Sequence, residues 1–175
     1  AFDSLATDAV PFLEGRGIRV YGTLPRDEEL AGVTVAELAD EMGAEVLTSD
    51  VPTDGRIRRF VVGAMSAGEA LGQLRRVREA ALITGGDRTD IQTAALEASG
   101  IECLLLTGGF HPPDTVLGRA ASAEVPVLLV RTDTATTLDR TDSVMNTGKT
   151  RDGRTVDRMS RLLEDYADID AILDA

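Results

Sequence analysis

The sequence predicts an α/β fold in which a mostly parallel β-sheet, built from repeated βα units, carries helices on both faces. From residue 60 onward, short apolar segments alternate with amphipathic segments of helical period, which is the pattern of consecutive βαβ units. Residues 81–83, 101–106 and 125–130 are nearly continuous apolar runs, as expected for strands covered on both sides. With 175 residues, of which 43% are hydrophobic, the chain can bury one substantial core.

The most specific helix signal lies in the first third of the chain. Thr34, followed three residues later by Glu37, is a capping-box pattern that predicts the start of a helix. Gly43 follows the apolar stripe of this helix and predicts its end. The other elements predicted in this part are an amphipathic stretch at 5–13, a strand at 18–21 with a turn at 25–27, a short strand at 45–47 and a loop at 49–55.

From residue 60, strands and helices follow each other regularly. Ser66 with Glu69 repeats the capping-box spacing, Gly100 ends a second helix, and Pro113 stands at the start of a third. The predicted strands are 60–64, 80–84, 101–107 and 125–130. The predicted helices are 66–77, 87–99, 113–123, 134–145 and 154–166, with a polar segment at 146–153 and a short tail at 169–173.

The charge balance of the chain argues against some partners. The sequence holds 30 acidic and 18 basic residues, for a net charge of −12, so nucleic acid and anionic membrane surfaces are poor partners. It has no apolar run of about 18 residues, the length that a membrane-spanning helix needs. Lys149 is the only lysine. An acidic, lysine-poor surface is typical of a salt-adapted cytoplasm, and the alternative is an ordinary acidic protein from a GC-rich genome.

The chain offers few groups for catalysis. Cys103 is the only cysteine, so an intramolecular disulfide is impossible, which fits a reducing cytoplasm. Cys103 lies in a predicted strand, where we expect a buried small hydrophobe. His111 is the only histidine, and no Gly-x-Ser-x-Gly or zinc-type spacing occurs. We therefore predict no catalytic residue and no metal ligand, and the sequence identifies no cofactor.

Small polar turns follow three consecutive predicted strands. Ligands of parallel sheets bind at the C-terminal ends of the strands, and the shared strand direction places these turns on one rim. Glycine-rich turns and helix N-termini accept anions, and Arg88 and Arg131 can add bidentate contacts to phosphate or carboxylate groups, such as those of a phosphate-bearing metabolite. The predicted ligand-binding residues are Gly85, Gly86, Asp87, Arg88, Thr89, Thr107, Gly108, Gly109, Arg131, Thr132, Asp133 and Thr134.

The same residues also have a purely structural interpretation. Gly-Gly pairs after strands commonly only supply positive φ angles. Asp87, Thr89 and Asp133 stand where helix caps are expected. Arg88 and Asp133 can pair with each other or bridge two subunits. The sequence leaves the ligand-binding and the structural interpretation open.

Residues 86–92, Gly-Asp-Arg-Thr-Asp-Ile-Gln, resemble the DRTGG domain. Residues 106–109 are similar to the second glycine turn of that family, 126–134 to its third block, and 146–163 to its polar tail. This chain departs from the eponymous order, because an aspartate follows the threonine and the glycines precede the first aspartate. The resemblance spans about 33–173. It implies a regulatory or dimerising domain without an assigned reaction and a fold similar to the N-terminal domain of HPr kinase.

A second resemblance concerns the beginning of the chain. Residues 13–30 look like the closing strand and Pro-x-Asp turn of a dethiobiotin-synthetase-like ATPase. DRTGG domains occur between such an ATPase and a phosphotransacetylase region, and within nucleotide-regulated CBS-type pyrophosphatases. We therefore expect residues 1–32 to be an arm and the remnant of an upstream ATPase-like domain, and residues 33–175 to be the DRTGG-type domain. The chain would then be the C-terminal part of a larger protein.

Three functions are compatible with the sequence. The first is a non-catalytic, cytoplasmic regulatory domain that forms a homodimer and senses an anionic metabolite or nucleotide at the rim. The second is an acyl- or phosphoryl-transfer enzyme similar to phosphate acetyltransferase, which the shortage of general acid–base groups disfavours. The third is a pure oligomerisation module that binds no small molecule.

Overall fold

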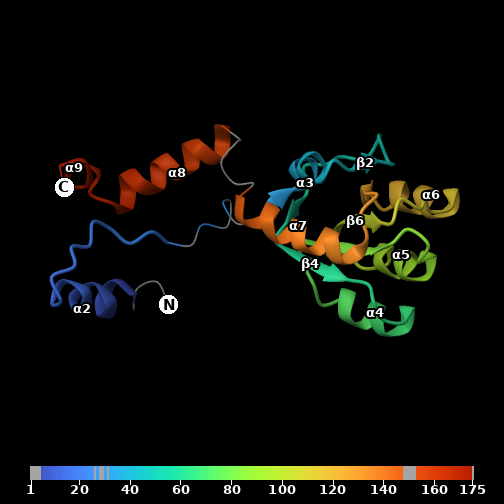
Figure 1. The fold of residues 1–175 in the computed structure, drawn as a ribbon, viewed down its shortest axis with the longest axis horizontal. Helices are drawn as coiled ribbons and strands as arrows, with labels where there is room; N and C mark the ends of the chain where they lie inside the picture. Colours follow the sequence, from blue (N-terminus) through green and yellow to red (C-terminus); the bar gives the residue numbers. More distant parts are fainter. Residues whose placement is uncertain (1–4, 26, 28–29, 31, 148–152, 175) are drawn as a thin grey trace. The chain divides into compact units, whose positions relative to one another are not determined.

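The computed structural model describes residues 5–25, 27, 30, 32–147 and 153–174. The chain divides into two compact units, which we call the α/β unit (Gly32–Gly148) and the terminal unit (Ala1–Ala31 with Lys149–Ala175). Figure 1 shows the elements of both. Within the described residues, no helix is long and apolar enough to cross a membrane.

A five-stranded sheet forms the centre of the α/β unit, in the order β2-β7-β6-β5-β4. The strands β4 (Arg59–Val62), β5 (Ala80–Gly85), β6 (Ile101–Thr107) and β7 (Val127–Leu129) pair in parallel, whereas the edge strand β2 (Glu45–Val46) runs antiparallel to β7. The predicted α/β class with a mostly parallel sheet is confirmed.

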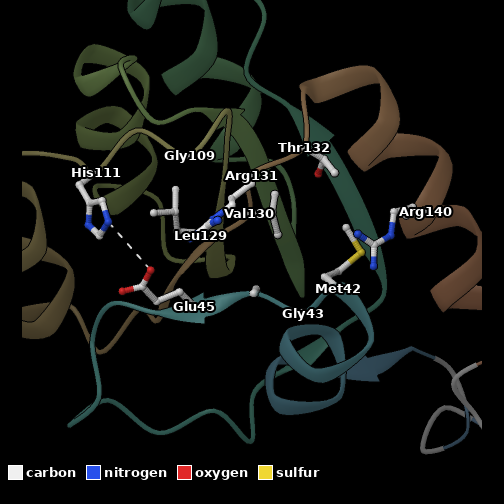
Figure 2. A pocket seen from close by; sticks show the side chains of 11 residues that line it. Met42, Gly43, Glu45, Gly109, His111, Leu129, Val130, Arg131, Thr132 and Arg140 are labelled. Atoms are coloured by element: carbon white, nitrogen blue, oxygen red, sulfur yellow. Dashed lines mark ion pairs between the residues drawn. The ribbon is translucent and has the colours of Figure 1, made fainter.

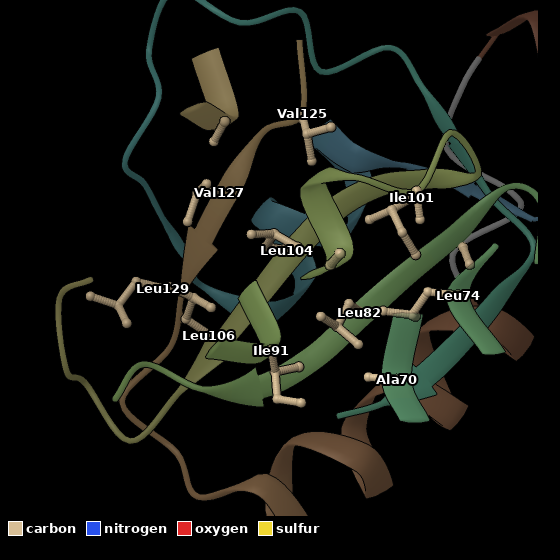
Figure 3. Packing of buried hydrophobic residues seen from close by; sticks show 14 residues of the cluster. Ala70, Leu74, Leu82, Ile91, Ile101, Leu104, Leu106, Val125, Val127 and Leu129 are labelled. Carbon is tan, nitrogen blue, oxygen red and sulfur yellow. The ribbon is translucent and has the colours of Figure 1, made fainter. Parts of the chain in front are cut away.

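Helices cover both faces of this sheet. Alternate side chains of a strand point to opposite faces, so Leu82, Leu104 and Leu106 belong to one hydrophobic cluster, and Ile83 and Leu105 to the other. Figure 3 shows the first cluster, in which α4, α5 and α6 pack against the sheet. The second cluster joins the sheet to α3 and α7. The helices are α3 (Val35–Met42), α4 (Ala67–Leu74), α5 (Thr89–Leu96), α6 (Asp114–Ser122) and α7 (Thr134–Thr147).

The helix α3 has the predicted capping box. The Glu37 amide donates to Thr34 Oγ1 at 3.1 Å, and the Thr34 amide donates to Glu37 Oε2 at 2.7 Å. Gly43 ends the helix with φ +60°, a conformation that glycine adopts without steric cost. Thr34 also belongs to β1 (Val33–Thr34), which pairs antiparallel with β3 (Arg56–Ile57). We did not predict β1 or β3, whose two residues each carry little periodicity.

Two predicted helices end earlier than expected. The helix predicted at 66–77 ends at Leu74, and the one predicted at 87–99 ends at Leu96. In both, the last predicted turn is instead used to return the chain to the start of the next strand, at Ala80 or Ile101. Parts of the turn at 25–27 and of the polar segment at 146–153 lie outside the described residues.

In the terminal unit, the strand predicted at 18–21 is wrong. Gly22 makes only an isolated antiparallel bridge with Ala167, and the Asp168 amide donates to the Tyr21 carbonyl at 2.6 Å. No longer strand lies beside this segment in the described residues, so the apolar alternation has no ladder to join. The elements of this unit are a π-helical turn at Leu5–Ala9, α2 (Val10–Glu14), α8 (Gly153–Tyr166) and α9 (Ile169–Leu173).

We expected residues 33–175 to form one domain and 1–32 to stand apart. In the structure, residues 149–175 instead group with 1–31. Besides the bridge at Gly22, the link between these two segments includes a hydrogen bond of 2.7 Å from Arg158 Nε to Asp27 Oδ2. This long-range pairing is set by tertiary contacts that leave no local pattern in the sequence.

Candidate functional site

The three predicted turns meet at the C-terminal edge of the sheet. The Gly86 amide donates to the Thr107 carbonyl at 3.1 Å, and the Gly108 amide donates to the Thr132 carbonyl at 2.9 Å. The Thr107 and Thr134 hydroxyls lie 2.8 Å apart. Each turn is therefore hydrogen-bonded to the next one along the sheet, and many of the polar groups predicted to bind a ligand bind each other.

The side chain of Gln92, which we did not predict as part of the rim, supports the first turn through hydrogen bonds. This side chain is fully buried, and its Nε2 donates to the carbonyls of Gly85 at 3.0 Å and Gly86 at 3.1 Å. The backbone of the first turn also approaches the second turn so closely that a Cβ on Gly86 would overlap the Phe110 carbonyl oxygen. The glycine at position 86 therefore serves the close packing of the two turns.

The Arg88 side chain forms hydrogen bonds to Asp90 at the start of α5 and to the loop that contains Met65. Its Nε and a terminal nitrogen bind the two carboxylate oxygens of Asp90 at 3.0 and 3.1 Å, and a terminal nitrogen also donates to the Met65 carbonyl at 2.9 Å. The Asp90 hydrogen bond raises the pKa of Arg88, and the same bond lowers the pKa of Asp90. The alternative in which Arg88 pairs with Asp133 is wrong, because the Arg88 guanidinium binds the carboxylate of Asp90, two residues further along the chain.

Asp133 caps the helix that follows it. Its Oδ1 accepts from the Thr136 amide at 3.0 Å, and its Oδ2 accepts from the Thr136 hydroxyl at 2.7 Å, as an N-cap residue does. The hydrogen bond from the Thr136 amide lowers the pKa of Asp133. Asp87 and Thr89 do not cap α5, whose N-cap position is Arg88 without a side-chain cap.

A cavity of about 600 Å³ lies beside the third turn, between β7, the end of α3 and α7 (Figure 2). Of the predicted residues, Gly109, Arg131 and Thr132 line it, and the others do not. The first turn, with its arginine, is therefore not part of the cavity. The remaining lining residues are Met42, Gly43, Ala44, Glu45, His111, Leu129, Val130 and Arg140.

Two arginines supply the positive charge of this cavity. Arg140 is half-buried, and a terminal nitrogen donates to the Glu41 carbonyl at 2.9 Å, which fixes its guanidinium against the end of α3. Arg131 is exposed. Neither makes an ion pair with a carboxylate of the described residues. Guanidinium groups with unused donors bind carboxylate and phosphate groups, so the cavity can accept an anion.

The opposite end of the cavity has a different chemistry. Glu45 Oε2 lies 3.9 Å from His111 Nε2, and both side chains are exposed. In Figure 2, Arg131 lies between this pair and Arg140. A ligand whose anionic group binds the arginines would present its other end to a carboxylate, which accepts hydrogen bonds.

Sequence reasoning missed the arginine on α7 and the Glu45–His111 pair. Arg140 lies inside a helix, whereas the predicted ligand-binding residues stand at strand ends. Glu45 lies in the strand predicted at 45–47, but the antiparallel pairing that brings this strand beside β7 is not evident from the sequence. The one available signal was that β2 begins close to a helix end and so can border the rim.

The described residues contain no group of three His, Cys, Asp or Glu side chains that could hold a metal ion. Cys103 is fully buried in β6, and burial raises the pKa of its thiol. The expectation that it is a buried small hydrophobe is confirmed.

Comparison with known proteins identifies a family. The model of the DRTGG domain matches residues 37–144. The chain is 28% identical over 141 residues to a phosphate acetyltransferase of Pseudomonas putida and 30% identical over 151 residues to one of Synechocystis, covering 77% and 80% of this chain. It is 30% identical over 111 residues, 63% of this chain, to the uncharacterized protein YtoI of Bacillus subtilis. The matches span only 20%, 22% and 24% of these three relatives.

Among solved structures, the chain is similar to one with a TM-score of 0.49 and 18% identity over 76% of this chain and 66% of the other. It is the crystal structure of the CBS and DRTGG domains of the regulatory region of Clostridium perfringens pyrophosphatase, complexed with its activator diadenosine tetraphosphate.

Proposed function

This chain belongs to the DRTGG domain family, and we propose that it is a non-catalytic regulatory domain that binds an anionic metabolite in the cavity beside β7. The observation that carries the proposal is the pair Arg131 and Arg140, which line one cavity without a carboxylate partner in the described residues. A net charge of −12 repels anions from the surface as a whole, so a site that binds them needs such a local concentration of positive charge.

The ligand class follows from both ends of the cavity. Phosphate groups suit the two guanidinium groups, whereas the apolar residues Met42, Leu129 and Val130 line the cavity but are almost fully buried. Glu45 favours a ligand whose far end donates hydrogen bonds. A nucleotide, with a phosphate group for the arginines and sugar hydroxyls for Glu45, fits both polar ends better than inorganic phosphate.

Calorimetric titration tests this proposal. The full chain is titrated with adenine nucleotides, acetyl phosphate, coenzyme A and inorganic phosphate. We expect Arg131→Ala and Arg140→Ala each to weaken binding about tenfold, equivalent to ~1.4 kcal/mol. Arg75→Ala is the matched control, because Arg75 is exposed at the end of α4 and outside the cavity. Binding of none of these compounds, or equal loss in the control, would contradict the proposal.

Arg88→Ala separates this cavity from the rim that we predicted. If the ligand binds at the first turn, this variant loses affinity, whereas Arg131→Ala and Arg140→Ala do not. We expect the reverse, because Arg88 is occupied by Asp90 and the Met65 carbonyl. Thermal unfolding of each variant controls for loss of the folded state.

The second candidate function is acyl or phosphoryl transfer, which the names of two relatives favour. The chain spans only about a fifth of those proteins, and its one thiol is buried. The candidate predicts turnover of acetyl phosphate by the chain alone, and its absence at high protein concentration would end it. A pure oligomerisation module, the third candidate, predicts a dimer that binds none of the titrated anions.

The setting of the domain is part of the proposal. We infer a cytoplasmic homodimer in a protein related to phosphate acetyltransferases or dethiobiotin synthetases, with residues 1–32 as the remnant of an upstream ATPase-like domain. The single cysteine supports a reducing compartment. Light scattering tests whether the chain forms a dimer. Co-purification with a separately expressed upstream region tests whether the chain associates with an ATPase-like domain.

A further inference from the structure

The terminal unit exposes most of the large hydrophobic side chains that the structure leaves in contact with solvent. Leu162 is the only fully buried hydrophobic residue among the described residues of this unit. A segment that buries so little apolar surface gains little stability alone, and clustered exposed apolar side chains mark interaction surfaces. The exposed side chains of the unit are Phe12, Ile18, Leu24, Val156, Met159, Leu163, Tyr166, Ile172 and Leu173.

The helix α8 gathers four of them in one stripe. Val156, Met159, Leu163 and Tyr166 are 47, 38, 38 and 44% exposed, and they follow each other at intervals of three, four and three residues. This is the spacing of the a and d positions of two heptads, which places the four side chains on one face of a helix that packs against another helix.

The neighbouring face of the same helix is already used within the terminal unit. Leu162 is buried there, and Arg158 binds the Asp27 carboxylate with its Nε at 2.7 Å. The stripe Val156–Tyr166 is rotated away from this face and stays exposed. The unit therefore holds α8 in place while presenting the stripe outward.

The charges of this region favour one orientation of a second copy. Residues 153–162 contain three arginines and one aspartate, whereas residues 163–170 contain four carboxylates and no basic residue. Parallel pairing of two copies would place the two acidic halves side by side. Antiparallel pairing places each basic half beside an acidic half and also opposes the two helix dipoles.

We infer that the α8 stripe is a docking surface for the α8 stripe of a second copy of this chain, packed antiparallel. The pairing buries Val156 against Tyr166 of the second copy and Met159 against Leu163 of the second copy. The inference rests on the homodimer of the proposed function and names its surface. It is independent of the anion cavity, which belongs to the α/β unit.

Disulfide trapping tests the orientation. Val156→Cys and Tyr166→Cys chains are prepared separately, then mixed under a mild oxidant. We expect a cross-linked dimer in the mixture and little from either variant alone, because the two Val156 positions would lie about 15 Å apart along the helices, whereas a disulfide needs Cβ atoms within about 4.5 Å. The unmodified chain, with only the buried Cys103, is the control. Cross-linking of Val156→Cys alone would overturn the antiparallel arrangement.

The oligomeric state of two charge variants tests the surface itself. Met159→Glu is expected to convert the dimer into a monomer in light scattering, while Leu173→Glu, on the exposed end of α9, leaves it a dimer. A wild-type monomer would overturn both this inference and the proposed homodimer. A Met159→Glu variant that stays dimeric would overturn this inference but not the proposed homodimer. The same holds if the stripe binds the upstream region instead of a second copy. Titration of the same variants with adenine nucleotides reports on the anion cavity separately.

Discussion

At Gly86 the backbone of one strand-end turn lies directly against the next. A Cβ at this position would overlap the Phe110 carbonyl oxygen, which is backbone and cannot rotate away. Gly86→Ala should therefore destabilise the protein by about 2 kcal/mol, in the range of overpacked interior substitutions, as measured by urea unfolding.

Gly118 provides the control for this substitution. It lies in α6 with no atom near the place of a Cβ, so Gly118→Ala should stabilise the protein by about 0.5–1 kcal/mol because alanine is the better helix former. Equal effects of the two substitutions would contradict the packing explanation of Gly86.

Arg88 and Arg140 show how neighbouring groups decide which guanidinium donors are available to a ligand. Arg88 stands in the motif that carries the family resemblance, yet Asp90 and the Met65 carbonyl occupy its donors. Arg140 stands in no motif, yet it lines the cavity. Whether a guanidinium can bind a ligand depends on its neighbours in space, and the spacing of residues along the sequence does not reveal those neighbours.

The N-terminus of α3 carries a complete capping box. Thr34→Ala removes the acceptor of the Glu37 amide and should cost about 1 kcal/mol in the free energy of unfolding. Ser66 precedes α4 at the same spacing, and its hydroxyl donates to Glu69, but it accepts no backbone amide. Ser66→Ala should then cost less than about 0.5 kcal/mol. Denaturant unfolding of both variants measures the difference, and equal costs would refute it.

The start of α7 should respond to acid. The pKa of Asp133 is lowered in the folded state, so its carboxylate contributes stability that is present above the unfolded pKa of about 3.9 and is lost as the pH falls through the lower folded pKa. Asp133→Asn should be less stable than wild type at pH 7, and the difference should vanish in strong acid. Thermal unfolding against pH measures it, with Asp139→Asn on the same helix as the charge control. A difference that grows in acid would contradict the assignment.

For the whole molecule, charge should dominate the response to salt. A net charge of −12 makes the compact state repel itself, and salt screens this repulsion. The unfolding temperature should therefore rise as potassium chloride increases from about 0.1 to about 1 M, where the screening length falls from ~10 to ~3 Å. Calorimetry measures this. A flat or falling profile would argue against the salt-adapted origin that the composition suggests.

The sequence by itself determined the architecture of the α/β unit. Apolar runs such as 101–106, short and bounded by Gly100 and Gly108, are typical of buried strands, and local caps such as Thr34 with Glu37 indicate where helices begin. It also determined that the strand-end turns meet, because parallel strands share a direction. Boundaries at Leu74 and Leu96 were missed, because chain reversal into the next strand overrides helix propensity there.

Only the tertiary structure decided which polar groups are available. In the folded chain, internal hydrogen bonds occupy the side chains of Arg88, Asp133 and Gln92. Arg140 and Glu45 reach the cavity from elements that lie far apart in the chain. It also joined residues 149–175 to the N-terminal segment. Hydrogen-bond partners and long-range packing depend on distances between residues that are remote in sequence, and local patterns do not encode those distances.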